Sequence, residues 1–185
     1  DMSKLIIHHH LGLGDNIDCN AIVRFLSDGY ESVDVFAKKS YATMVEYMYR
    51  DLDKINIVPV DGNEYDEVAK YLTEQPEDGV NFLRIGHENY PPNAPADKNC
   101  WELFYDQLNL PHEIKYEYFY IKSDEEEENR VYNKLNPNNE DFIFVHEESS
   151  MGVFPFDLET DMKIIRNDVE ENIFHFTKIL NKAKE

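Results

Sequence analysis

The sequence has few basic residues and no long hydrophobic run. Only 18 Lys and Arg stand against 38 Asp and Glu, which gives a formal charge of −20. Binding to nucleic acid or to an anionic membrane requires concentrated positive charge, so we expect neither as the main partner. No apolar stretch approaches the roughly 20 residues of a membrane span, and the first apolar run is too short for a signal peptide.

Cysteine is also scarce, because Cys19 and Cys100 are the only two. They form neither a metal-binding spacing nor a disulfide framework, so we expect reduced thiols in a cytoplasmic protein. Hydrophobic residues, by contrast, make up 42% of the 185 residues and include 12 Tyr and 11 Phe. This content supports a folded core in one large domain or two small ones.

Hydrophobic patterning predicts alternating strands and helices over the first half of the chain. The expected strands are 5–8, 32–37, 54–60 and 80–85, and the expected helices are one capped by Asp15 or Asn16, then 41–49 and 64–74. This order indicates an α/β fold with a Rossmann-like parallel sheet and right-handed crossovers.

The second half of the chain is less regular. Its expected elements are a proline-rich loop at 87–98, helices at 100–108 and 123–135, and an extended aromatic segment at 114–121. The turn-forming run at 136–139 predicts a domain boundary, which separates a domain at 1–136 from a segment at 140–185. That segment carries expected strands at 141–146 and 163–166 and a helix at 172–183, so we expect the start of a second, incomplete αβ domain.

The most informative stretch is the turn after the first strand, HHHLGLGD. Ligands of parallel sheets bind beyond the carboxyl ends of the strands, and Gly12 and Gly14 allow the backbone to approach a ligand closely. The turn lacks the third glycine of a dinucleotide fingerprint and the lysine of a P-loop. Asp15 would repel a phosphate, so two roles remain for it: a carboxylate that accepts a proton from a neutral hydroxyl, or a helix N-cap.

Three consecutive histidines, His8, His9 and His10, precede this turn. Successive strand residues point to opposite faces, so the three cannot bind one ion together, and we expect no metal ligands here. We expect His9 or His10 to line the cleft, as a donor to substrate or a partner of Asp15. His87 opens the loop after the fourth strand and is a candidate for the same edge.

The stretch HHHLGLGDNIDCNAIVRFL resembles the N-terminal signature of GT-B glycosyltransferases of the ADP-heptose transferase type. YATMVEYMYRDLDKINIVPV and FIFVHEESSMG also resemble glycosyltransferase-like proteins of phages and large viruses. The resemblance is good over residues 4–60. It implies metal-independent transfer of a sugar from a nucleotide-diphosphate donor to a hydroxyl of a small molecule or glycan, with no cofactor.

The resemblance also implies residue roles. Asp15 takes the position of the family's catalytic base. The expected acceptor-binding residues are His9, His10, Gly12, Gly14 and His87. The loop after the strand at 141–146 matches the first diphosphate-facing turn of the family's donor domain, and the implied donor contacts are His146, Ser149, Ser150 and Gly152.

The family's donor domain is larger than the segment at 140–185, so a partner that supplies the missing donor half is expected. Two other functions stay open. One is a non-catalytic αβ binding or assembly module with the same sheet. The other is a different nucleotide-dependent enzyme that uses the same turn.

Overall fold

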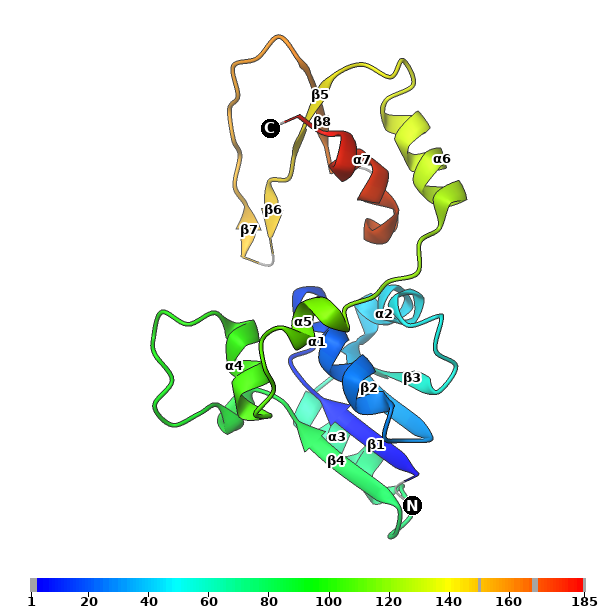
Figure 1. Ribbon diagram of the computed structural model, residues 1–185, viewed down its shortest axis with the longest axis vertical. Helices are drawn as coiled ribbons and strands as arrows, with labels where there is room; N and C mark the ends of the chain where they lie inside the picture. The colour runs from blue at the N-terminus through cyan, green and yellow to red at the C-terminus, as the bar shows by residue number, and fades with distance from the viewer. Residues whose placement is uncertain (1–2, 150, 168–169, 185) are drawn as a thin grey trace. The chain divides into compact units, whose positions relative to one another are not determined.

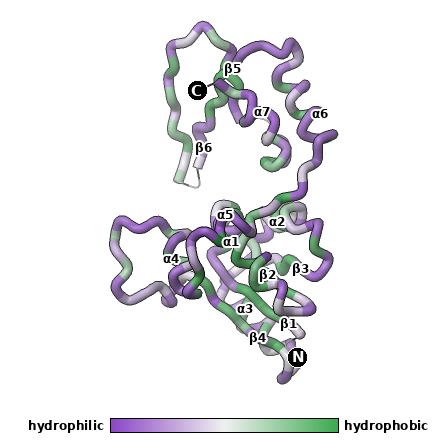
Figure 2. Tube along the Cα trace, viewed as in Figure 1, coloured by the Kyte–Doolittle hydropathy of each residue, from purple (hydrophilic) through white to green (hydrophobic). Residues whose placement is uncertain are grey.

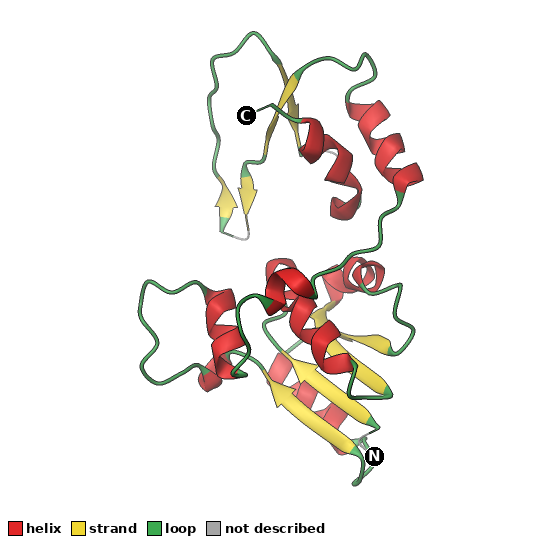
Figure 3. Cartoon of the chain, in the orientation of Figure 1, coloured by secondary structure: helices red, strands yellow, loops and turns green. Residues whose placement is uncertain are grey.

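The computed structural model describes residues 3–149, 151–167 and 170–184. The chain divides into two compact units, Asp1–Lys122 and Ser123–Glu185. Figure 3 shows that both units combine helices with strands. Within the described ranges, no helix combines the length and the apolar character that crossing a membrane requires.

The first unit is built on a four-stranded parallel sheet in the order β3-β2-β1-β4. Its strands are β1 (Lys4–His8), β2 (Ser32–Lys38), β3 (Ile55–Val60) and β4 (Val80–Arg84). β1 is central, and its Leu5 pairs with Val33 of β2 and Asn81 of β4. The four expected strands and the α/β fold with a Rossmann-like parallel sheet are therefore confirmed.

Helices cover both faces of this sheet. α1 (Leu13–Ser27) follows β1, α2 (Ala42–Met48) follows β2 and the short η1 (Lys39–Tyr41), and α3 (Glu64–Thr73) joins β3 to β4. In Figure 1, α1 lies in front of the sheet and α3 behind it. The connection through α3 returns across β2 and β1, and right-handed crossovers then require the opposite face. Val68 of α3 accordingly packs against Ile6, Phe36 and Val60.

The rest of the first unit is η2 (His87–Asn89), α4 (Cys100–Gln107) and α5 (Ile114–Glu117). The prediction of an extended segment at 114–121 is wrong, because its first residues form the helical turn α5. The Pro111 carbonyl accepts a hydrogen bond from the Ile114 N–H, and the Lys115 ammonium lies 2.9 Å from the Asp18 carboxylate of α1. Local turn bonds and contacts with α1 therefore decide the conformation of this aromatic run.

The second unit contains α6 (Glu125–Leu135), a parallel pair of strands and a short hairpin. The pair is β5 (Phe142–Val145) with β8 (Lys163–Arg166), and the hairpin is β6 (Glu148–Ser149) with β7 (Gly152–Val153). η3 (Ile173–Phe176) and α7 (Thr177–Lys182) complete it. The core residues of this unit are Val131, Tyr132, Phe142, Ile165, Phe176 and Ile179.

The division between the units precedes α6, whereas the turn at 136–139 suggested a later boundary. Val131 and Tyr132 of α6 pack against Phe142 of β5, so this helix belongs to the second unit. Figure 2 shows hydrophobic residues along the strands of the sheet and hydrophilic residues along α6. Only a narrow stripe of α6 is apolar, which made its packing partner hard to predict.

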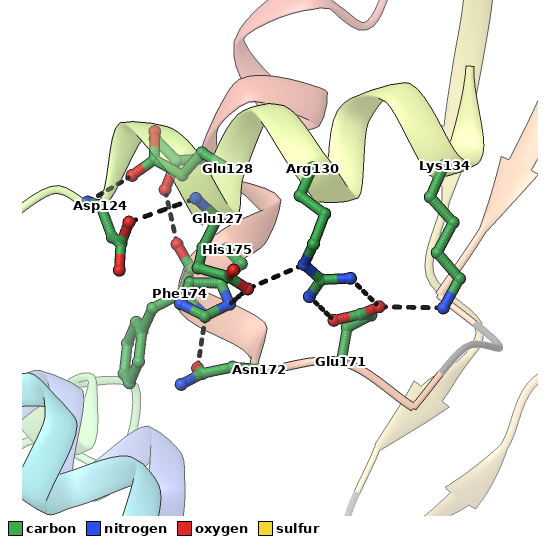
Figure 4. A network of polar contacts seen from close by, with 10 residues as sticks. Asp124, Glu127, Glu128, Arg130, Lys134, Glu171, Asn172, Phe174 and His175 are labelled. Atoms are coloured by element: carbon green, nitrogen blue, oxygen red, sulfur yellow. Dashed lines mark hydrogen bonds and ion pairs between the residues drawn. The ribbon is translucent and has the colours of Figure 1, made fainter. Parts of the chain in front are cut away.

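An ion-pair network holds the outer side of α6 to the segment before η3 (Figure 4). Glu171 accepts hydrogen bonds from Arg130 at 2.6 and 3.1 Å and from Lys134 at 2.9 Å. The Glu171 side chain is only 8% exposed, and these two cations lower its pKa to about 2. The helix is capped by Asp124, which accepts from the Glu127 N–H.

We predict that Glu171→Gln lowers the free energy of unfolding at neutral pH. The folded-state pKa lies below the usual value of 4.5, so the stabilisation is complete above that value and is lost as pH falls towards about 2. Urea unfolding at several pH values should therefore show a difference from the wild type that narrows under acid conditions. Glu170→Gln, at an exposed neighbouring position, is the control, and equal stability of all three proteins at neutral pH would contradict the prediction.

Candidate functional site

Chemically active side chains gather where β1 and β4 end and where α1 and α3 begin. β1 and β4 pair up to His8 and Arg84, and Glu64 is the first residue of α3. The carboxyl edge of a parallel sheet is where ligands of such folds bind.

Asp15 lies in the first turn of α1. Gly12 is the N-cap residue, so the expectation that Asp15 or Asn16 caps this helix is wrong. The Asp15 carboxylate turns back towards Gly12, and a Cβ on Gly12 would lie 2.7 Å from its Oδ2. Burial raises the pKa of Asp15, while the positive charge that His10 can carry and the N–H groups of Gly12 and Asp15 act in the opposite direction.

His10 lies beside this turn in a defined tautomer. Its Nε2 accepts a hydrogen bond from the His87 backbone N–H at 3.3 Å and lies 2.9 Å from the Tyr90 hydroxyl. Because a backbone N–H can only donate, Nε2 is unprotonated, and the proton of the neutral ring is on Nδ1. Burial lowers the pKa of His10, and the charge of Asp15 opposes this shift.

His9 does not lie at this edge. Its side chain is fully buried, and its Nδ1 contacts the backbone oxygen of His10. Burial lowers its pKa to about 4, so the ring is neutral at physiological pH. Of the two histidines expected to line the cleft, only His10 is in a position to do so.

A second group, which we call the imidazole–carboxylate cluster, consists of His8, Glu64 and His87. The His8 Nε2 is 3.7 Å from Glu64 Oε2, and the His87 Nδ1 is 3.8 Å from Glu64 Oε1. The two imidazole centroids are 4.6 Å apart. Ligand-type atoms of all three residues lie within 4.8 Å of one another.

Each imidazole of the cluster has a hydrogen-bond partner at Nδ1 but, among the described residues, none at Nε2. Arg84 Nε donates to His8 Nδ1 at 3.0 Å, and the Tyr65 hydroxyl lies 2.8 Å from His87 Nδ1. The Nε2 atoms of both imidazoles are buried without a hydrogen-bond partner. Burial, and then the neighbouring His87 and Arg84, lower the pKa of His8 to about 3, so this ring is neutral.

The sequence did not point to Glu64, Tyr65 or Tyr90. Glu64 begins the helix after β3, and the amino ends of such helices lie at the same edge as the carboxyl ends of the strands. That rule could have selected Glu64. Nothing in the irregular loop that holds Tyr90 predicts its contact with His10.

The residues expected to contact a donor lie in the second unit. His146 follows β5, while Ser149 and Gly152 belong to the β6–β7 hairpin, and all three are exposed. Ser150 lies outside the described residues. His146 pairs with Asn167 at 3.2 Å. The neighbouring Glu147 accepts hydrogen bonds from the Phe156 N–H and from Arg166. The first of these bonds, and then the second, lower the pKa of Glu147.

Comparison with known proteins assigns no relative to this chain: no protein-family model, no curated protein and no solved structure matches it.

Gly86 brings His87 against His10. It has φ +77°, and a Cβ there would lie 2.6 Å from the His10 Nε2 and 3.0 Å from a ring carbon of Phe104. We predict that Gly86→Ala costs about 1–3 kcal/mol of unfolding free energy, because the backbone conformation is one that L residues rarely adopt.

The matched control is Gly14→Ala. An added Cβ at Gly14 meets nothing within 4 Å, and alanine is favoured over glycine in helices, so stability should be unchanged or slightly higher. Chemical denaturation measures both variants. Equal stability of the two would contradict a close approach at Gly86.

Proposed function

We propose that the chain carries the acceptor side of a GT-B-type glycosyltransferase. A hydroxyl of a small molecule or glycan binds where β1 ends, and Asp15 accepts its proton. The acceptor oxygen forms the new bond to the anomeric carbon of the sugar. The bond from that carbon to the nucleotide diphosphate breaks, and the diphosphate leaves with the electron pair.

The observation that carries this proposal is the environment of Asp15. Its half-buried carboxylate has a raised pKa, which makes it a stronger base than a free aspartate. Gly14, one residue before it, is exposed, and no atom occupies the space where its side chain would be. A hydroxylated ring can therefore approach the backbone beside the base.

His10 gives the base a defined neighbour. The ring is held at Nε2 by the His87 N–H and the Tyr90 hydroxyl, so its Nδ1 can donate a hydrogen bond. A neutral donor next to a carboxylate suits a neutral hydroxylated acceptor. The net charge of −20 also disfavours an acceptor that carries several negative charges.

The donor would be a nucleotide-diphosphate sugar, with no further cofactor. Contacts from His146, Ser149, Ser150 and Gly152 are part of the proposal on the strength of the sequence resemblance. A partner that supplies the rest of the donor side is part of it as well. Helix N-termini and side chains, in place of a metal ion, would offset the charge of the leaving diphosphate.

We predict that Asp15→Asn lowers sugar transfer by about 10²–10⁴-fold, the usual contribution of a general base. The assay supplies the intact protein with a panel of nucleotide sugars and hydroxylated acceptors and measures the glycosylated product. Asp28→Asn, at the exposed end of the same helix, removes the same charge and should leave transfer unchanged. Undiminished transfer by Asp15→Asn would exclude this residue as the base.

A second candidate function is a non-catalytic binding module. It is favoured by the position of the Asp15 carboxylate, which turns back towards the N-cap residue Gly12, because an aspartate in the first turn stabilises a helix through its dipole without any catalytic role. In that case Asp15→Asn would cost about 0.3–1 kcal/mol of stability. Calorimetry would then detect a sugar or nucleotide sugar binding without turnover.

A further inference from the structure

The imidazole–carboxylate cluster has polar atoms that the protein itself leaves unused. Two buried Nε2 atoms, one on His8 and one on His87, have no hydrogen-bond partner. Unpaired buried polar groups are rare in folded proteins because they are costly. Glu64 lies beside both rings, yet its oxygens are 3.7 Å from His8 Nε2 and 3.8 Å from His87 Nδ1, too far for a normal hydrogen bond.

The three residues come from separate parts of the fold. His8 ends β1, Glu64 begins α3, and His87 follows β4. The first two are held by regular elements, and the backbone of His87 is fixed by its N–H bond to His10. The Glu64 side chain is 27% exposed, so it can adjust while the rings stay in place. Fixed imidazoles with one adjustable carboxylate can close around a small ligand.

We propose that His8, Glu64 and His87 bind a divalent transition-metal ion of the zinc class. Two imidazole nitrogens and one carboxylate oxygen form a ligand set typical of catalytic zinc sites, which keep a fourth position for water. Ligand atoms around tetrahedral zinc lie about 3.3 Å apart, given bonds of about 2.0–2.1 Å. Atoms already within 4.8 Å of one another need only a small inward movement of side chains.

Metal binding requires a change at His8. In the metal-free protein Arg84 donates to Nδ1, so the proton of the neutral ring is on Nε2. A metal at Nε2 moves that proton to Nδ1, and Arg84 must then release the ring. Its guanidinium has a second partner nearby, because Nη1 lies 3.6 Å from Glu88 Oε1. Arg84 and the ion therefore compete for His8.

The contact with Tyr65 suits His87 as a ligand. The Tyr65 hydroxyl lies 2.8 Å from His87 Nδ1 and can accept a hydrogen bond from an N–H at that nitrogen. The unpaired Nε2 then has its lone pair free. Metal-binding histidines commonly donate their other N–H to such an outer partner.

The ligand set also determines the class of ion. Imidazole favours zinc, copper, nickel and iron, whereas magnesium and calcium prefer oxygen ligands alone. The inference uses different residues from the proposed base Asp15, and it does not depend on sugar transfer.

The first test is calorimetric titration of the intact, chelator-treated protein with Zn²⁺. We expect one ion per chain, and a loss of affinity of at least about 100-fold in Glu64→Gln and in His87→Asn. Asparagine is chosen because residue 87 has φ +57°, a conformation that asparagine tolerates. Thermal melts without zinc establish that each variant is folded.

The matched controls are Glu74→Gln, at an exposed position at the end of the same helix, and His112→Ala, whose ring pairs with Asp106. Both should bind zinc like the wild type. The proposal is overturned if zinc affinity is the same in Glu64→Gln and in the wild type, if His112→Ala abolishes binding, or if Mg²⁺ displaces the zinc.

The second test uses Arg84→Gln. A glutamine oxygen can accept the Nδ1 proton of metal-bound His8, and the competing cation is gone, so zinc affinity should rise about tenfold. A fall in zinc affinity would contradict the inference that Arg84 and the ion compete for His8. Because this variant is expected to gain affinity, general damage to the fold cannot imitate the result.

Discussion

β1 pairs with β2 on one side and with β4 on the other, and the whole candidate site depends on this central position. Its apolar residues Ile6 and Ile7 are completely buried, so the strand cannot rotate or shift without exposing one face of the core. The chain leaves the sheet immediately after His8. The residues that follow β1 therefore begin at the carboxyl edge of the sheet.

That alternation separates the three consecutive histidines. His8 shares the face of Ile6, where Phe36 lies edge-on to its ring at 5.9 Å. This is the face that α3 covers, so His8 meets Glu64. His9 is directed into the interior, and His10 reaches the turn that holds Asp15. Three identical neighbours in sequence thus have three different environments: His8 lies at the end of the strand, His9 in the interior and His10 beside the turn.

Periodicity was sufficient to predict the strands and helices of the first unit, because each of its buried faces repeats over several residues. It failed at α5, where an aromatic run has the composition of a strand but its backbone bonds are those of a local turn. It also left α6 in the first unit, because few apolar residues of this helix, Val131, Tyr132 and the partly buried Leu135, pack against the core of the second.

The candidate site was only partly predictable for a related reason. Strand alternation accounts for the side of the sheet on which His8 lies, yet it says nothing about which distant residues the three histidines will meet. Glu64 joins His8 because α3 crosses to the face of Ile6, and His87 reaches His10 because Gly86 adopts a positive φ. Both contacts depend on the path that the chain takes between strands and helices, and the hydrophobic pattern within one element does not predict that path.

The proposed base and the proposed metal ligands use different residues, but one contact connects them. The rings of His10 and His87 stack with centroids 4.3 Å apart, and after burial the neighbouring His87 lowers the pKa of His10. An ion bound to His87 would add positive charge beside His10, which disfavours protonation of that ring. His10 would then stay a neutral donor next to Asp15. The two sites could therefore act together through this stacked pair, although either could exist without the other.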